Sequence, residues 1–228
     1  KNQLNAFGPF EGHLIGCEYD TRRLIRMSLQ KVGDTYQGAA YPFTYNEPKE
    51  GDPLLGPLAC AVGPDGNLYI GCIRDSGWGG ANNIGSIARV ELKRAHEMPA
   101  GIAEVIARRD GFMIKFTNGP FARLDVGKMI DPDTYSVVAY TRKSTPSYGG
   151  GDVDRHQVKL KDFVGLSATN DFVFIQTEEA FKEGYVYEIR MKNICQKEGD
   201  EFGPADIVMN NAGVAGGGAI SMIELSAW

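Results

Sequence analysis

LACAVGPDGNLYIGC, residues 58–72, joins two apolar runs through the tetrapeptide Gly63-Pro64-Asp65-Gly66. The proline fixes the first dihedral angle of a turn, and Asp-Gly supplies the positive φ that a tight hairpin requires. The stretch therefore predicts two antiparallel strands, at residues 58–63 and 67–73, joined by a short turn.

The same pattern of short apolar runs between turn residues extends along the chain. With 29 glycines and 11 prolines among 228 residues, turns recur every 8 to 15 positions and favour many short strands. The fold class is therefore predicted to be all-β, with single helical turns only at 94–98 and 178–181. Strands are expected at 13–19, 23–31, 36–43, 58–63, 67–73, 86–92, 103–108, 113–117, 136–142, 156–160, 172–176, 186–191 and 206–209.

Two domains and a tail are expected. The strand motif LIGC at 14–17 returns as LYIGC at 68–72, about 55 residues later, and this interval is typical of propeller blades. Residues 1–98 are therefore interpreted as about two propeller-type blades. Seven strands in 99–211 have the density of an immunoglobulin-like sandwich, although the Cys-Trp-Cys core of antibody domains is absent there. Residues 212–228 form a glycine-rich tail, with a further strand expected at 220–225.

Composition excludes several classes of protein. The 24 basic and 29 acidic residues give a net charge of -5 without a basic block, which argues against nucleic-acid binding. No run of apolar residues has the length of a membrane-spanning helix. The four cysteines show no C-x-x-C spacing, which argues against a haem or zinc-knuckle site. Cys60 and Cys72 are not expected to lie opposite each other. The cysteines are either buried free thiols or partners in a disulfide, and the sequence leaves both alternatives open.

Three residues are candidate binding groups. His13 stands at a strand start, where it is either a functional base or a hydrogen-bonded structural histidine. Arg74 and Trp78 follow the hairpin in RDSGWGG, residues 74–80. A tryptophan flanked by glycines either stacks on a sugar or anchors a partner, or it packs against the next strands. No Lys-Ser or Lys-Thr follows these glycines, so a phosphate loop is rejected.

Asp152 and Asp154 are the candidate metal ligands. In the extended segment Asp152-Val153-Asp154 the two carboxylates are predicted to share one side, and calcium prefers such oxygen ligands. The alternative is an ordinary solvated loop, because no complete calcium-loop pattern surrounds them. No catalytic residue is assigned.

A family resemblance rests on the motifs GCIRDSGWGG at 71–80 and FGPFEGHL at 7–14, with DGFMIKFT at 110–117, DPDTYSV at 131–137 and GYVYEI at 184–189. Together they resemble the last blades and the following Ig-like domain of secreted sorbosone/glucose dehydrogenase-like β-propeller proteins, over residues 7–211. The resemblance implies export to the periplasm or cell surface. It also implies pyrroloquinoline quinone (PQQ) or calcium in the complete protein, and a c-type cytochrome module among the partners.

The leading hypothesis is a noncatalytic accessory chain of an exported assembly, because about two blades cannot close a propeller and leave sheet edges that other subunits would cover. No cofactor is expected within this chain alone. Two alternatives remain: the C-terminal fragment of a quinone-dependent sugar dehydrogenase, or a carbohydrate-binding module that uses Tyr135, Tyr140, Tyr148 and Phe163. The absence of an initial Met and of an apolar leader indicates a mature, cleaved form or an internal piece.

Overall fold

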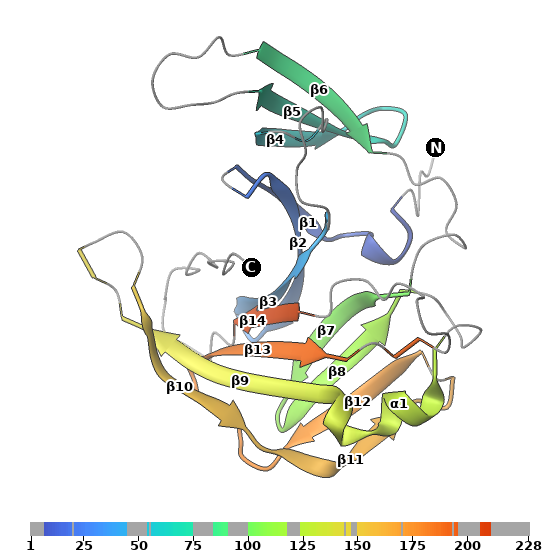
Figure 1. Ribbon diagram of the computed structural model, residues 1–228, viewed down its shortest axis with the longest axis vertical. Coiled ribbons are helices and arrows are strands. Elements are labelled where there is room, and N and C mark those ends of the chain that lie inside the picture. The colour runs from blue at the N-terminus through green and yellow to red at the C-terminus, as the bar shows by residue number, and fades with distance from the viewer. Residues whose placement is uncertain are drawn as a thin grey trace. The chain divides into compact units, whose positions relative to one another are not determined.

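The protein is all-β, as predicted, and its strands are antiparallel (Figure 1). The computed structural model describes residues 7–19, 21–44, 54, 56–74, 84–90, 100–117, 124–143, 145–146, 150–169, 171–192, 194–195 and 206–210. The chain forms two compact units. Unit 1 comprises residues 1–27, 41–97 and 225–228, and unit 2 comprises 28–40 and 98–224. Strands β2 (Arg23–Val32) and β3 (Thr35–Pro42) run from one unit into the other.

Unit 1 contains the hairpin that the sequence predicts. Strands β4 (Pro57–Val62) and β5 (Leu68–Arg74) are antiparallel, and β6 (Ile84–Val90) pairs with the other side of β5. Gly66 has a φ of 83°, a left-handed conformation that favours glycine, and its N–H donates to the carbonyl of Gly63 at 2.9 Å. The turn therefore forms as its residue types predict. Strand β1 (Leu14–Glu18) pairs separately with the first half of β2.

The core of unit 1 lies on one face of the β4-β5-β6 sheet. Leu68, Ile70 and Cys72 alternate along β5 and are all buried, together with Ala88 of β6 and Leu24 of β2. This period of two is the signature of a strand with one covered face. Burial of these apolar side chains is the main term that stabilises the unit.

Unit 2 has two antiparallel sheets. The first belongs to a seven-stranded sheet with the spatial order β1, β2, β3, β14 (Asp206–Asn210), β13 (Val186–Met191), β9 (Tyr135–Arg142) and β10 (Asp152–Val158), of which β1 and the first half of β2 are part of unit 1. The second contains β11 (Leu160–Leu166), β12 (Phe172–Thr177), β8 (Gly111–Phe116) and β7 (Ile102–Arg108). Figure 1 shows β9 and β13 on one side and β8 and β12 on the other. Phe112 of β8 is fully buried, 5.8 Å between ring centroids from Tyr187 of β13, so side chains of the two sheets meet in a shared core.

Three local elements differ from the sequence expectation. The strand predicted at 156–160 is wrong, because β10 ends at Val158 and a second strand, β11, begins at Leu160. The helical turn predicted at 178–181 is also wrong, since these residues form bends and coil. A short helix, α1 (Val126–Ile130), was not expected. Its N-cap Asp125 accepts a hydrogen bond from the N–H of Lys128 at 3.2 Å. The turn predicted at 94–98 lies outside the described residues.

The four cysteines are not joined by disulfides. Cys60 pairs with Ile70 across the β4–β5 ladder, and Cys72 lies opposite Pro57, so Cys60 and Cys72 are out of register, as expected. None of the helices in the described parts of the chain has the length and apolarity to cross a membrane.

The predicted domains 1–98 and 99–211 and the tail 212–228 stay predictions. One boundary between the two units lies between residues 97 and 98, next to the predicted one. Residues 28–40, however, belong to unit 2. The N-terminal part of the chain thus supplies strand residues to both units.

Candidate functional site

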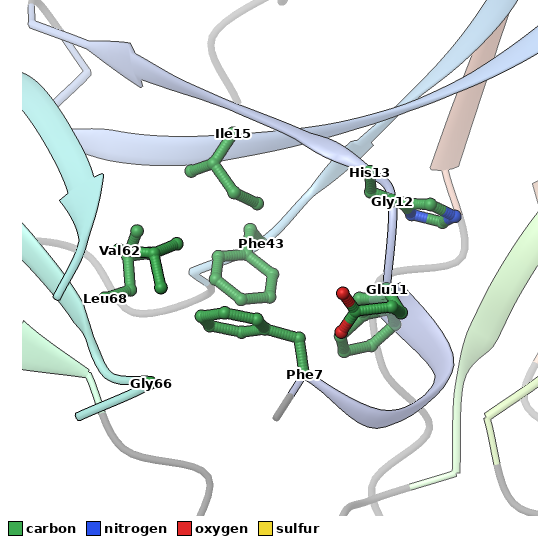
Figure 2. Close-up of a pocket in the computed structure, with 10 residues that line it drawn as sticks. Phe7, Glu11, Gly12, His13, Ile15, Phe43, Val62, Gly66 and Leu68 are labelled. Atoms are coloured by element: carbon green, nitrogen blue, oxygen red, sulfur yellow. The ribbon is translucent and has the colours of Figure 1, made fainter. Parts of the chain in front are cut away.

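A pocket of about 320 Å³ in unit 1 is the candidate site (Figure 2). Its volume is at the small end of the range for sites that take a ligand or a side chain. Six of its ten lining residues are large and apolar, and only two carry a titratable group. The lining consists of Phe7, Phe10, Ile15, Phe43, Val62 and Leu68 with Glu11, Gly12, His13 and Gly66. The site is therefore suited to an apolar group.

A tight turn before β1 supplies one wall of this pocket. Gly8 and Gly12 have φ angles of 55° and 79°, which a residue with a Cβ rarely adopts. The N–H of Phe10 donates to the carbonyl of Phe7 at 3.1 Å, and the N–H of His13 donates to Phe10 at 3.0 Å. These bonds hold the aromatic rings of Phe7 and Phe10 at the pocket.

The second wall comes from the end of β3. The N–H of Phe43 donates to the carbonyl of Leu24 at 3.0 Å, and the N–H of Leu24 donates to the hydroxyl of Thr44 at 3.1 Å. The ring of Phe43 meets that of Phe10 edge to face, with centroids 5.8 Å apart and planes at 87°. This edge-to-face geometry is a favoured arrangement of two aromatic rings.

The third wall comes from the β4–β5 hairpin, through Val62 and Leu68, which are cross-strand partners. The carboxylate of Asp65 accepts bonds from the hydroxyl of Tyr69 at 2.7 Å and from the side-chain amide of Asn67 at 2.8 Å. The Tyr69 bond, followed by those from Asn67, lowers the pKa of Asp65 below its ordinary value. Asp65 therefore acts as a turn-forming residue, and it fixes the hairpin beside the pocket.

Beside the pocket, a buried arginine holds His13. Arg26 of β2 is only 3% exposed, and its guanidinium carbon lies 4.2 Å from the ring centroid of Phe10 and 4.0 Å from that of Tyr41. Its NH1 lies 2.8 Å from Nδ1 of His13. Because a guanidinium only donates, this ring nitrogen accepts the bond. His13 also stacks on Tyr41, with centroids 6.4 Å apart and planes at 12°.

This contact favours the structural interpretation of His13 over that of a general base. The Nδ1 atom is engaged by Arg26, and in Figure 2 the imidazole points away from Phe7, Phe43 and Val62. What remains toward the cavity is apolar surface and the exposed Glu11. The pocket can therefore bind an apolar group and has no set of groups arranged for proton transfer within the described residues.

Of the predicted binding residues, the structure places His13 at this pocket. Arg74 is the last residue of β5, and nothing is described of its side chain. Trp78 lies outside the described residues. The sequence analysis did not single out Arg26. The structure buries Leu24, Arg26 and Ser28 on one face of β2. No local signal in the sequence marks Arg26, because Phe10 and Tyr41 meet it only in the folded chain.

Asp152 and Asp154, the predicted metal ligands, bind cationic and hydroxyl groups of unit 2. The carboxylate of Asp152 accepts bonds from Arg155 at 2.9 Å and from Arg142 at 3.3 Å. That of Asp154 accepts a bond from the hydroxyl of Tyr185 at 2.5 Å. This bond is the main reason that the pKa of Asp154 is lowered. Among the described residues, no group of three potential ligands is placed to hold a metal ion.

The β10 strand is also irregular at Asp154. The register with β9 shifts between Val153 and His156, and Asp154 has a φ of 54°. A bulge of this kind redirects side chains relative to a regular strand. The simple i, i+2 alternation used in the sequence analysis therefore does not describe this segment.

Comparison with known proteins adds no relative. No family model matches the chain, and neither a curated protein nor a solved structure matches it.

Proposed function

We propose that the chain is a noncatalytic docking component of a larger assembly, and that its unit 1 pocket receives an apolar side chain of a partner protein. The observation that carries this proposal is the lining of the pocket. Three phenylalanines and three aliphatic side chains surround it, and the neighbouring His13 is engaged by Arg26. Desolvation of such a lining by an inserted apolar group drives association.

The apolar surface continues from the pocket along β4. Leu58 and Val62 are 53% and 58% exposed, and the half-buried Cys60 lies between them. In the described part of the three-stranded sheet β4 is an edge strand. An edge strand with apolar side chains beside a pocket is suited to an extended segment that carries apolar residues at alternate positions. We therefore propose an extended protein segment as the partner.

The blade and sandwich architectures and the membership of a protein family are part of the same proposal. The β4-β5-β6 sheet is proposed as a propeller-type blade, and unit 2 as an Ig-like sandwich. The two facing sheets of unit 2 support the second assignment, and the blade motifs at 14–17 and 68–72 support the first. Membership of the sorbosone/glucose dehydrogenase-like proteins, export, a role as the C-terminal part of a quinone enzyme and a cytochrome partner rest on the sequence motifs alone.

The alternative of carbohydrate binding by unit 2 receives less support. It requires a row of exposed aromatic residues, whereas Tyr135 and Tyr140 are 6% and 4% exposed. Phe163 of β11 is 68% exposed, and Tyr148 lies outside the described residues. Of the described residues among these four candidates, Phe163 alone is exposed, which offers little surface for stacking on a sugar chain, so docking remains the function that we propose.

The test is a comparison of two arginine substitutions within one sheet. Val62→Arg places a charge at the pocket, whereas Ile87→Arg places one on the opposite face of the sheet, at a side chain that is 78% exposed. Tagged wild type and both variants are expressed in the source organism, and their native masses are measured. We expect the wild type and Ile87→Arg to travel in a complex and Val62→Arg to lose it. If Val62→Arg assembles like the wild type, the pocket is not the docking site.

A further inference from the structure

Two half-buried thiols lie on neighbouring strands of unit 1. Cys17 lies on β1 and Cys60 on β4, and these two strands are in contact. The thiol of Cys60 donates a hydrogen bond to the carbonyl of Ile15 at 3.6 Å. Ile15 is two residues before Cys17, so the two side chains leave β1 on the same side. Both cysteines pack against the buried cluster around Ile70.

The two thiols also influence each other. Burial raises the pKa of Cys17 to about 11, and the neighbouring Cys60 adds to this effect, first of all through its charge. The carbonyl that accepts the Cys60 thiol lies two residues before Cys17, which places the two side chains in the same region of unit 1. Cys72 acts on Cys17 more weakly, through its charge alone, and its own thiol donates to the carbonyl of Ile70 at 3.8 Å.

We propose that Cys17 and Cys60 form a disulfide in an oxidising environment, and that this bond ties β1 to β4. The reaction is a thiol–disulfide exchange with a small disulfide such as oxidised glutathione. One cysteine thiolate attacks the oxidant, a mixed disulfide forms, and one glutathione thiol leaves. The second thiolate attacks the mixed disulfide at the cysteine sulfur, which releases the second glutathione. The protein loses two protons and two electrons, and the oxidant is reduced to two thiols.

Neither of the other two cysteines is suited to this pairing. Cys60 and Cys72 lie on paired strands but out of register, with Ile70 and Pro57 as their respective partners. Cys195 is a residue of unit 2, where it is 1% exposed. Cys72 acts on Cys17 more weakly than Cys60 does, so Cys17–Cys60 is the pair that we propose.

The disulfide has a consequence for the pocket. Ile15 is two residues from Cys17, Val62 is two residues from Cys60, and both line the cavity. A covalent bond between Cys17 and Cys60 would therefore restrict the distance between Ile15 on one wall of the pocket and Val62 on the other. Because the pKa of Cys17 is raised, little of its thiolate is present at neutral pH, so uncatalysed oxidation is slow and accelerates as the pH rises.

The experiment maps the bond in the full chain. The protein is equilibrated in buffers of reduced and oxidised glutathione, quenched with acid, alkylated and cut with trypsin and an Asp-specific protease. Cleavage before Asp20 and Asp65 separates the peptides of Cys17, Cys60 and Cys72. We expect a cross-linked Cys17–Cys60 peptide pair, about 2 Da lighter than the sum of its two thiol peptides. It disappears when dithiothreitol is added.

Matched serine variants provide the controls. Cys72→Ser and Cys195→Ser are expected to form the same cross-link, whereas Cys17→Ser and Cys60→Ser lose it and keep all three remaining thiols free. Complete alkylation of Cys17 and Cys60 in the most oxidising buffer would overturn the proposal, as would a cross-link to Cys72. If a serine variant fails to fold, the peptide map of the wild type decides the question alone.

Discussion

Substitution of Arg26 tests whether the residues beside the pocket are structural. In Arg26→Met the side chain keeps its length and loses its charge. Two cation–π contacts with Phe10 and Tyr41 are removed, each worth about 2 kcal/mol when desolvated, together with a charged hydrogen bond to His13 worth about 2 kcal/mol. The guanidinium no longer has to be desolvated, which returns about 4 kcal/mol. The expected net loss of stability is therefore about 2 kcal/mol.

An equilibrium urea titration followed by far-ultraviolet circular dichroism measures this loss. With a slope of about 2 kcal/mol per molar urea, the midpoint should fall by about 1 M. Arg108→Met, at an exposed arginine of β7, is the control and should change stability by less than about 0.5 kcal/mol. Adding Tyr41→Leu to Arg26→Met completes a double-mutant cycle with an expected coupling of about 1 kcal/mol or more. Equal midpoints for Arg26→Met and Arg108→Met would refute the reasoning.

Three further predictions concern unit 2. Gly111→Ala should prevent normal folding, because the added Cβ would collide with a backbone oxygen of β12. Gly184→Ala has open space around the added Cβ but a φ of 74°, so it should lower the free energy of unfolding by about 1 kcal/mol. Thermal melts of the two variants check this difference. Asp154→Asn should destabilise the protein at neutral pH, because the bond from Tyr185 favours the carboxylate and lowers its folded-state pKa. The difference in stability from wild type should vanish as the pH falls below about 4 and the carboxylate takes up a proton. Urea titrations at several pH values check this. Tyr135→Phe leaves the Met129 carbonyl of helix α1 without its 2.6 Å bond and should cost about 1 to 2 kcal/mol in the same titration.

Where the sequence predicted the fold well, local chemistry was sufficient. Gly63-Pro64-Asp65-Gly66 contains its own turn, and the alternation of Leu68, Ile70 and Cys72 marks a strand with one buried face. The failures have equally local causes. Strand β11 carries exposed Lys161, Asp162 and Phe163, so its alternation is irregular, and a five-residue helix is too short to show a period of 3.6.

The candidate site was predictable only in part, since its residues meet through long-range packing. His13 was found because histidine is chemically unusual, whereas Phe10, Phe43 and Val62 are ordinary apolar residues until the fold brings them together. Arg26 was not singled out, because a charge is rarely buried unless rings and acceptors surround it. The pairing that we propose for Cys17 and Cys60 depends on how β1 and β4 meet, which single-sequence periodicity does not contain.

The most direct test of the docking proposal is the native mass of the endogenous, untagged chain purified from its source without denaturant. The proposal predicts a particle clearly heavier than the 24.9 kDa chain, with a second protein present in fixed proportion. A stable 24.9 kDa monomer with nothing bound would contradict it, and would mean that the apolar pocket and the exposed strand β4 serve no partner.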